Sequence, residues 1–209
     1  NRTMSIWVKG GSLLSEGEYQ AFFCAGQPLA GKHSTINFQT GGKVVFSSAD
    51  TNMLQTPENA LNQLAWNHIL LTQETGASSV TVSVYINNVL AVSGERALEI
   101  VAGDNLIIGG GYWNSAVQDA FTGTIMAPRM YNRVLSEAER STLYQEFDQV
   151  ESGGGDNILL SPATTVPTTG SPGLLYGNLF IPLEKSAPSV IPVEGLTAYY
   201  PLTENANDL

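Results

Sequence analysis

Short apolar runs, separated by Gly, Asn, Asp and Ser, recur through the first two thirds of this 209-residue chain. In the run at 80–86, Val or Ile occupies every second position, and Thr, Ser or Tyr occupies the positions between. Such alternation predicts a strand with one buried and one solvated face, as in antiparallel sheets. Asn87 and Asn88 follow at once and tolerate positive φ, so we predict a tight hairpin that leads into a strand at 89–94.

The same pattern predicts ten strands, at 4–9, 18–26, 34–39, 43–48, 67–73, 80–86, 89–94, 98–101, 105–110 and 122–131. Many short strands at regular spacing are typical of an antiparallel sandwich or jelly roll. The chain is therefore predicted to be all-β over this part of its length.

One helix is predicted near residue 137, because Ser136 and Glu139 have the spacing of a capping box. The helix should run for about three turns, end near Val150 and pack across a sheet end. Its apolar face is predicted from helical spacing to consist of Ala138, Leu143, Tyr144 and Phe147.

The composition changes at residue 152, and seven of the ten prolines lie at or beyond Pro162. Proline fixes φ and removes a backbone donor, so long strands are not expected at 151–194. The segment is nevertheless too apolar for a solvated linker, and we predict an extended arm that lies along a surface of this chain or of a partner. From Gly195 the sequence again predicts one strand followed by a turn.

The net charge and its distribution argue against one class of partner, nucleic acid. The 19 acidic and 9 basic residues give a net charge of −10, and the basic residues form no stripe, so we expect no nucleic-acid partner. No apolar run reaches the roughly 18–20 residues of a membrane span. With 43% apolar residues the chain has enough material for a core, which excludes wholesale disorder.

The cysteine and histidine residues predict no metal or thiol chemistry. Cys24 is the only cysteine and lies in the apolar run AFFCAG, so we interpret it as a small buried core residue. His33 and His68 are far apart in sequence and supply no zinc ligand set. His68 is interpreted as a packed or hydrogen-bonded strand residue.

Four segments, taken in order, resemble the motifs of a known family. They are Met4–Lys9, Trp66–Thr72, Val84–Asn88, and the closing pair Phe121–Ile125 and Arg129–Glu139. Together they cover most of residues 1–150, and they are similar to the laminin-G-like, concanavalin-A-like jelly-roll family. The resemblance implies an all-β, antiparallel jelly-roll sandwich with one short C-terminal helix, here followed by an extended Pro-rich tail. One departure is Met126-Ala127-Pro128, which stands where the family usually has Asp, so no role of that acid is carried over.

The order of the motifs is unusual for that family. Gly195–Leu209 resembles the segment with which such a domain opens, yet it stands at the far end of this chain. Residues 1–150 would then be a jelly roll that lacks its usual first strand. Three arrangements are open: a tandem array cut between repeats, donation of the strand to another subunit, or return of the strand to its own module. An unfilled strand position is an open edge that invites pairing, and the predicted pairing residues are Leu196, Tyr199, Tyr200 and Leu202.

No catalytic pattern is present. Hydrolases on this fold need two or three carboxylates along one strand, and the chain has no E-x-D-x-x-E spacing. It also has no G-x-S-x-G nucleophile elbow. We therefore expect the protein not to be an enzyme.

Two ligand chemistries have candidate residues. A sugar site needs an aromatic platform with a few fixed polar groups, and Tyr112, Trp113, Asn114 and Asp119 follow three glycines in a polar loop. The alternative is that Trp113 folds over the domain's own edge or meets a neighbour. The second candidate ligand is Ca²⁺, as a cofactor. Its leading predicted oxygen ligand is Asp208, and Asn205 and Asp104 are further candidates. The alternative there is that these are ordinary turn residues.

The sequence thus predicts a non-catalytic carbohydrate- or surface-recognition module, with a glycan or other cell-surface ligand. We expect it on an extracellular, cell-surface or virion protein. The alternative is a structural subunit that assembles with other copies of itself through residues 152–209. An assembly should lose its ability to polymerise when that tail is removed.

Overall fold

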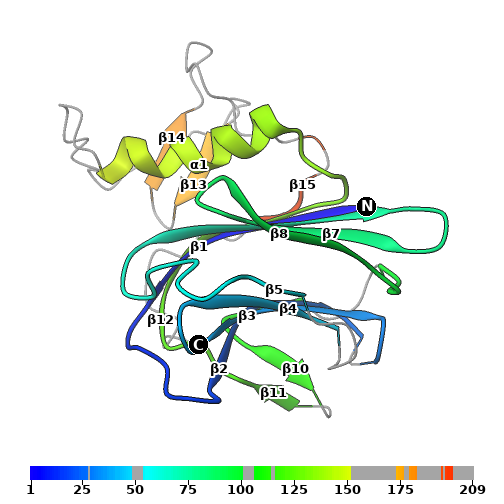
Figure 1. Cartoon of the computed structure of the whole chain (residues 1–209). Coiled ribbons are helices and arrows are strands. Elements are labelled where there is room, and N and C mark those ends of the chain that lie inside the picture. Colours follow the sequence, from blue (N-terminus) through cyan, green and yellow to red (C-terminus); the bar gives the residue numbers. More distant parts are fainter. Residues whose placement is uncertain are drawn as a thin grey trace.

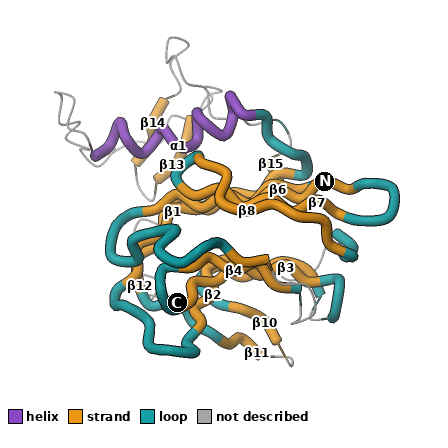
Figure 2. The backbone as a smooth tube through the Cα atoms, in the orientation of Figure 1, coloured by secondary structure: helices purple, strands orange, loops and turns teal. Residues whose placement is uncertain are grey.

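The computed structural model gives the arrangement of most of the predicted strands. The structure describes residues 1–27, 29–48, 54–100, 106–113, 116–151, 173–176, 179–182, 194 and 196–199. Two antiparallel sheets face each other, and a helix, α1 (Glu137–Glu151), lies on one of them (Figures 1 and 2). This confirms the all-β sandwich.

Sheet A has six strands in the order β15-β12-β1-β6-β7-β8, and sheet B has five in the order β5-β4-β3-β2-β9. The strands of sheet A are β1 (Arg2–Gly10), β6 (Asn67–Thr75), β7 (Val80–Ile86), β8 (Val89–Arg96), β12 (Gly123–Tyr131) and β15 (Leu196–Tyr199). Those of sheet B are β2 (Tyr19–Gly26), β3 (His33–Gln39), β4 (Lys43–Ser47), β5 (Leu54–Gln55) and β9 (Leu106–Ile108). Two hairpins stand apart from these sheets and were not predicted: β10 (Gly111–Trp113) with β11 (Ala116–Gln118), and β13 (Gly173–Tyr176) with β14 (Leu179–Pro182).

The strand with the clearest alternation is confirmed. The apolar residues of β7 are buried in the core, and Thr81 and Tyr85 are half-exposed on the other face. Asn87 and Asn88 adopt φ of 50° and 65°, as a two-residue hairpin turn requires. The predicted strand at 98–101 is wrong over its described residues, because Leu98 and Glu99 donate to Arg96 and Gly31 carbonyls and not to a ladder.

The core lies between the two sheets and is built from their facing alternate residues. Met4, Ile6 and Val8 of β1 face sheet B and are almost fully buried. The rings of Phe22, Phe38 and Phe121 meet edge to face, with centroids 5.0–6.2 Å apart. Edge-to-face contact is a preferred geometry for buried aromatic rings, so this group joins sheet B to the loop that precedes β12.

Helix α1 covers the outer face of sheet A, and the prediction that it packs across a sheet end is wrong. Leu143 is fully buried against Leu70, and the Tyr144 ring stacks on Trp7 at 5.7 Å. The helix packs there because the outer face of sheet A carries apolar residues that need cover.

The N-terminal cap of α1 is confirmed. The Ser136 backbone N–H donates to Glu139 Oε2 at 2.8 Å, and the Glu139 N–H donates back to Ser136 Oγ. Arg133 donates to the same carboxylate and lowers the pKa of Glu139 from 4.5 to about 2. The apolar face differs from the prediction at Ala138, which is exposed; Arg140 contributes instead, with its guanidinium over the Tyr85 ring. The side chain of Phe147 lies outside the described residues.

The departure from the family motif coincides with a β-bulge. Along the β1–β12 ladder, Ser5 pairs with Arg129 and Trp7 with Met126, so Ala127 and Pro128 together face one residue of β1. Ala127 takes a left-handed φ of 47°. A bulge leaves its extra residue unpaired, which is one of the few places where a strand accepts proline.

The segment that resembles a domain opening forms β15, an edge strand. β15 lies antiparallel to β12 of the same chain, with Arg129 opposite Tyr199 and Met130 opposite Ala198. The backbones of Leu196 and Tyr199 are thus in the ladder, while Tyr200 and Leu202 lie outside the described residues. Of the predicted arm, the described parts are the β13–β14 hairpin and Glu194. No helix among the described residues is long and apolar enough to cross a membrane.

Candidate functional site

The outer face of sheet B is the broad sheet surface that α1 leaves uncovered, because the helix lies on the opposite side of the sandwich (Figure 1). Alternation sets which residues form it. Ile36 and Phe38 of β3 point into the core, so Thr35, Asn37 and Gln39 point outward. This face is therefore polar along its central strand, on which Thr35 and Asn37 are buried and Gln39 is half-exposed.

One cross-strand row on this face combines an aromatic ring with hydrogen-bonding groups. In the ladder, Tyr19 lies opposite Gln39, and Gln39 lies opposite Lys43. We call these three residues the Tyr19 row. Gln39 Nε2 donates to the Tyr19 hydroxyl at 3.0 Å, and Tyr19 remains 37% exposed. Lys43 Nζ lies 3.0 Å from Glu58 Oε1. The row thus presents a ring, an amide and an ion-paired ammonium side by side.

The β10–β11 hairpin lies over the neighbouring part of the same face. A Cβ on Gly111 would lie 3.4 Å from the Ala21 Cβ and 3.8 Å from a Thr35 methyl carbon. These are van der Waals distances, so the start of β10 packs directly on β2 and β3. At the same open end of the hairpin, where Gly111 pairs with Gln118, the Ala21 N–H donates to the Asp119 carbonyl at 2.7 Å, and Asp119 has a left-handed φ of 52°. The open end of the hairpin is therefore fixed to β2.

A buried polar cluster lies beneath the hairpin. Cys24 Sγ is 2.8 Å from His33 Nε2, and Thr35 Oγ1 also contacts the imidazole. Burial raises the pKa of the Cys24 thiol, although hydrogen bonds from Thr35 and from the Tyr112 backbone oppose the shift. A thiol with a raised pKa stays protonated and is a poor nucleophile. The prediction that Cys24 is buried is confirmed, and its contacts hold β10 against the sheet.

The structure describes the side chains of two of the four predicted ligand residues, one on this hairpin and one beside it. Tyr112 is half-buried on β10, and Asp119 is exposed just after β11. Trp113 ends β10 and pairs with Ala116, but its side chain lies outside the described residues, as does Asn114. The ligand role of this set stays a prediction.

Tyr19, Gln39 and Lys43 were missed by the sequence reasoning. They lie 20 and 4 residues apart along the chain and meet only through the β2–β3–β4 register. The available signal was the outward position of each residue in its strand. That signal identifies which residues share a face only when the bulge between Ala21 and Phe23 is known.

No group of three His, Cys, Asp or Glu side chains that could hold a metal occurs within the described part of the chain. The predicted calcium ligands Asp104, Asn205 and Asp208 lie outside that part. Calcium binding therefore stays a prediction.

The family assignment follows from the sandwich, its motifs and a family model. A model described as the concanavalin A-like lectin/glucanases superfamily matches residues 1–139. The chain belongs to this superfamily. No curated protein is similar enough in sequence to count as a match.

Solved structures share the fold at low sequence identity. The Ruminococcus gnavus IT-sialidase CBM40 superposes with a TM-score of 0.56 at 20% identity, covering 68% of this chain and 82% of that one. A leech intramolecular trans-sialidase gives 0.51 at 22% identity, covering 69% of this chain but 22% of the enzyme. A SAP-like pentraxin from Limulus polyphemus gives 0.50 at 15% identity, covering 68% and 69%. These likenesses establish the fold.

Proposed function

We propose that this protein binds a carbohydrate on the outer face of sheet B, between the Tyr19 row and the β10–β11 hairpin, and that it catalyses no reaction. The observation that carries the proposal is the exposed Tyr19 ring beside the Gln39 amide, on the sheet face opposite α1. The alternatives are calcium binding, catalysis and carbohydrate recognition. Within the described residues, only the groups that carbohydrate recognition needs lie close together.

The chemistry of the face suits a saccharide. A sugar offers an apolar C–H surface to an aromatic ring and hydroxyls to amide, hydroxyl and carboxylate groups. The Tyr19 row supplies the Tyr19 ring and the Gln39 amide, and the hairpin with its flank supplies Tyr112 and Asp119. The sheet and the anchored hairpin hold these groups before a ligand arrives, which reduces the entropic cost of binding.

The structural neighbours support this proposal. The Ruminococcus gnavus module that shares the fold is also seen bound to α2,3-sialyllactose. Binding by that protein supports a glycan ligand here. The extracellular, cell-surface or virion setting is part of the proposal, because exposed glycans are found there.

The absence of catalysis rests on the carboxylate count at the face. Glycoside hydrolysis uses two carboxyl groups that flank the scissile bond. The Tyr19 row and the β10–β11 hairpin with its flanking Asp119 contain one carboxylate, that of Asp119. Glu58 borders the row but is ion-paired with Lys43. One carboxylate can orient a sugar without hydrolysing it.

Variants on this face are expected to weaken glycan binding. Tyr19→Ala and Tyr112→Ala should each reduce affinity by about tenfold, because a lost contact of about 1.4 kcal/mol corresponds to that factor. Titration calorimetry with the best glycan from an array measures the change. Leu90→Ala is the matched control, since Leu90 is an exposed side chain on β8 of sheet A. Unchanged affinity in both tyrosine variants, or no binding on the array, would refute the proposal.

A second candidate function is self-assembly through β15, and one observation favours it. The strand that fills the β12 edge is reached only through residues 152–195, and it contacts the body through the ladder and an Arg133 Nε donation to the Glu194 carbonyl at 2.8 Å. An edge strand on a long connection can be exchanged between copies.

Cysteines at one ladder pair distinguish the two arrangements of β15. A Met130→Cys/Ala198→Cys double variant should form an intrachain disulfide, because facing strand residues lie within bridging distance. If copies exchange strands, a mixture of the two single variants forms a disulfide-linked heterodimer whose yield rises with protein concentration. Non-reducing electrophoresis separates the products. A mixture that stays monomeric while the double variant cross-links would exclude assembly by β15.

A further inference from the structure

We infer that the ligand of the sheet B face is a neutral glycan and not a sialylated or otherwise acidic one. This inference rests on the proposed function and names its substrate class. It is carried by the position of every lysine and arginine that the structure describes. An acidic sugar needs a cation, or a set of donors, at its carboxylate.

Four arginines, which are buried or lie beside α1, have their interaction partners away from the proposed site. Arg2 lies between the sheets and donates to Gln73 Oε1 and Ser34 Oγ, both at 2.9 Å. The other three engage the α1 side of sheet A: Arg129 with Glu146, Arg133 with Glu139 and Arg140 with the Tyr85 ring. All three of these arginines therefore act on the opposite side of the sandwich from the proposed site.

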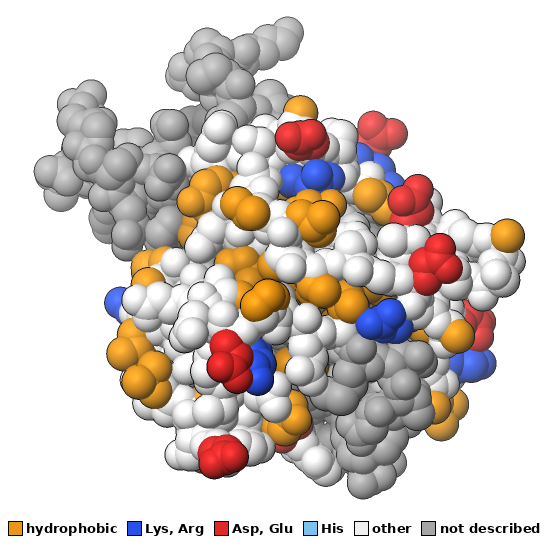
Figure 3. Space-filling model, in the orientation of Figure 1, with side chains coloured by type: hydrophobic (Ala, Val, Ile, Leu, Met, Phe, Trp, Pro, Cys, Tyr) orange, Lys and Arg blue, Asp and Glu red, His pale blue; other side chains and the backbone are white. Residues whose placement is uncertain are grey.

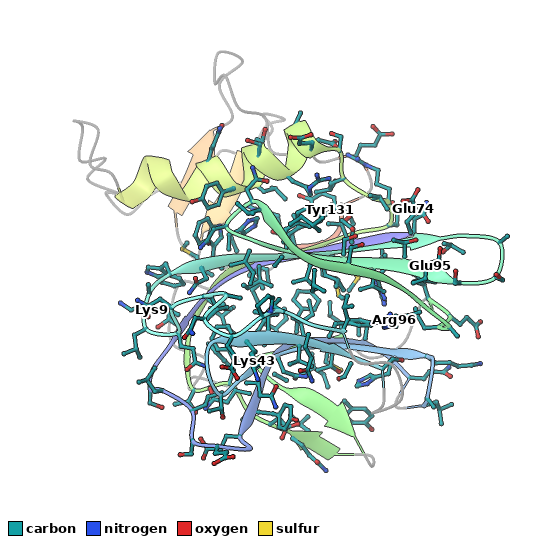
Figure 4. All side chains as sticks on the ribbon, in the orientation of Figure 1. Lys9, Lys43, Glu74, Glu95, Arg96 and Tyr131 are labelled. Atoms are coloured by element: carbon teal, nitrogen blue, oxygen red, sulfur yellow. The ribbon has the colours of Figure 1, made fainter. Side chains whose placement is uncertain are left out.

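The remaining described cations lie on sheet A or are ion-paired. Lys9 is two residues beyond Trp7 on β1, so alternation turns it to the outer face of sheet A, away from sheet B. Arg96 ends β8 of sheet A, at the opposite end of the sandwich (Figure 4). Lys32 lies 3.3 Å from Glu99. On the face drawn in Figure 3, blue side chains stand singly and several lie directly beside red ones. No cationic cluster is formed by the described residues.

Lys43 is the one cation in the strands of sheet B and the β10–β11 hairpin. Its ammonium is held by Glu58, so the pair presents no net positive charge to a ligand. The whole chain carries a net charge of −10. A ligand carboxylate at this face therefore meets repulsion that salt screens only in part.

The uncharged groups of the face point to hydroxyls. The Gln39 Nε2 group and the Tyr19 hydroxyl are hydrogen-bonded to each other at 3.0 Å and carry no charge. The acceptors Asn37 Oδ1 and Gln39 Oε1 are buried, so they do not themselves contact a ligand at the face. The Tyr19 hydroxyl, the Gln39 amide and the Asp119 carboxylate together match the O–H groups of a neutral sugar.

The test is binding to matched neutral and sialylated glycans on one array, including lactose with α2,3-sialyllactose, and neutral β-glucans. The full chain should bind at least one neutral glycan, and at least fivefold more tightly than the sialylated counterpart where one exists, at low salt. Equal or tighter binding of the sialylated members would overturn the inference while the proposed function stands. No binding to any glycan would overturn both.

Two charge-neutralising variants test the role of Lys43. Glu58→Gln releases the Lys43 ammonium beside the Tyr19 row, and we expect sialyllactose binding to rise about threefold or more. Glu99→Gln makes the same change in net charge but releases Lys32, at the opposite end of β3 from Gln39; it should leave sialyllactose binding within about 1.5-fold. An equal response of the two variants would contradict the inference.

Discussion

Replacing His68 with glutamine is expected to make the free energy of unfolding less dependent on pH between pH 7 and pH 4. His68 lies on β6 beneath α1, fully buried, with its Nε2 2.8 Å from Ser5 Oγ and its ring 5.0 Å from Trp7. Burial, with a smaller contribution from Arg129, lowers the pKa of His68 from 6.5 to about 3. In the folded protein the ring therefore stays neutral well below pH 6.5.

The sign of the effect follows from proton binding by the two states. Below pH 6.5 the unfolded chain takes up a proton at His68 that the folded protein does not, so acid favours unfolding. Each pH unit in this window weakens folding by about 1.4 kcal/mol, or about 2 kcal/mol by pH 5 and over 3 kcal/mol by pH 4. The stability is fully present above pH 6.5 and is lost as the pH falls toward 3.

Urea unfolding at pH 7, 6, 5 and 4 measures this dependence. Ser5→Ala is the matched control, because it removes the hydrogen bond at a roughly constant cost of about 1 kcal/mol but leaves the imidazole in place. We expect the Ser5→Ala curve to run parallel to that of the unmodified protein, and the His68→Gln curve to be flatter. Parallel curves for all three proteins would show that His68 does not titrate in this way.

Gly123→Ala is expected to destabilise the protein by about 3 kcal/mol, which corresponds to a fall of roughly 6–12 °C in Tm for a chain of this size. Gly123 pairs with Gly10 across the β1–β12 ladder. A Cβ at this position would overlap the Lys9 carbonyl oxygen and come within 2.9 Å of the Phe121 ring. β1 is held at this point, because Val8 pairs with Asn67 of β6 and the Gly10 N–H donates to the Gln63 carbonyl at 2.7 Å.

Gly94→Ala is the matched control for that change. Gly94 is also a strand glycine of sheet A, on β8, and a Cβ there would meet an Arg96 guanidinium nitrogen at 3.0 Å and a Leu54 methyl carbon at 3.4 Å. Both are ends of flexible side chains that can shift, so the cost should stay below about 1 kcal/mol. Thermal unfolding followed by circular dichroism compares the two variants. Similar Tm values for Gly123→Ala and Gly94→Ala would mean that the backbones of β1 and β12 shift to accommodate the added methyl group.

Local chemistry explains why most of the body was predictable. The alternation at 80–86, the Asn87–Asn88 turn and the Ser136–Glu139 cap each require only neighbours within a few residues. The burial of Cys24 and His68 followed from the apolar and strand-like runs that contain them. In each case one short segment holds all of the interacting groups.

The site and the helix position could not be predicted in this way, because they depend on how distant segments meet. The Tyr19 row exists only through the register of three strands, which a bulge in β2 shifts. The hairpin packs on Ala21 and Thr35 of two other strands, a relation that needs the sheet to be in place. The docking surface of α1 likewise depends on Trp7 and Leu70, which are far from residue 137 in sequence.

The position of α1 also sets the orientation of the molecule. The helix lies on the outer side of sheet A, on the side of the sandwich away from the Tyr19 row (Figure 2). A support that contacted the protein through the α1 side would leave the polar face turned toward the surroundings. Many copies fixed on one support would then all present that face outward. Their individually weak contacts would combine into a high overall avidity.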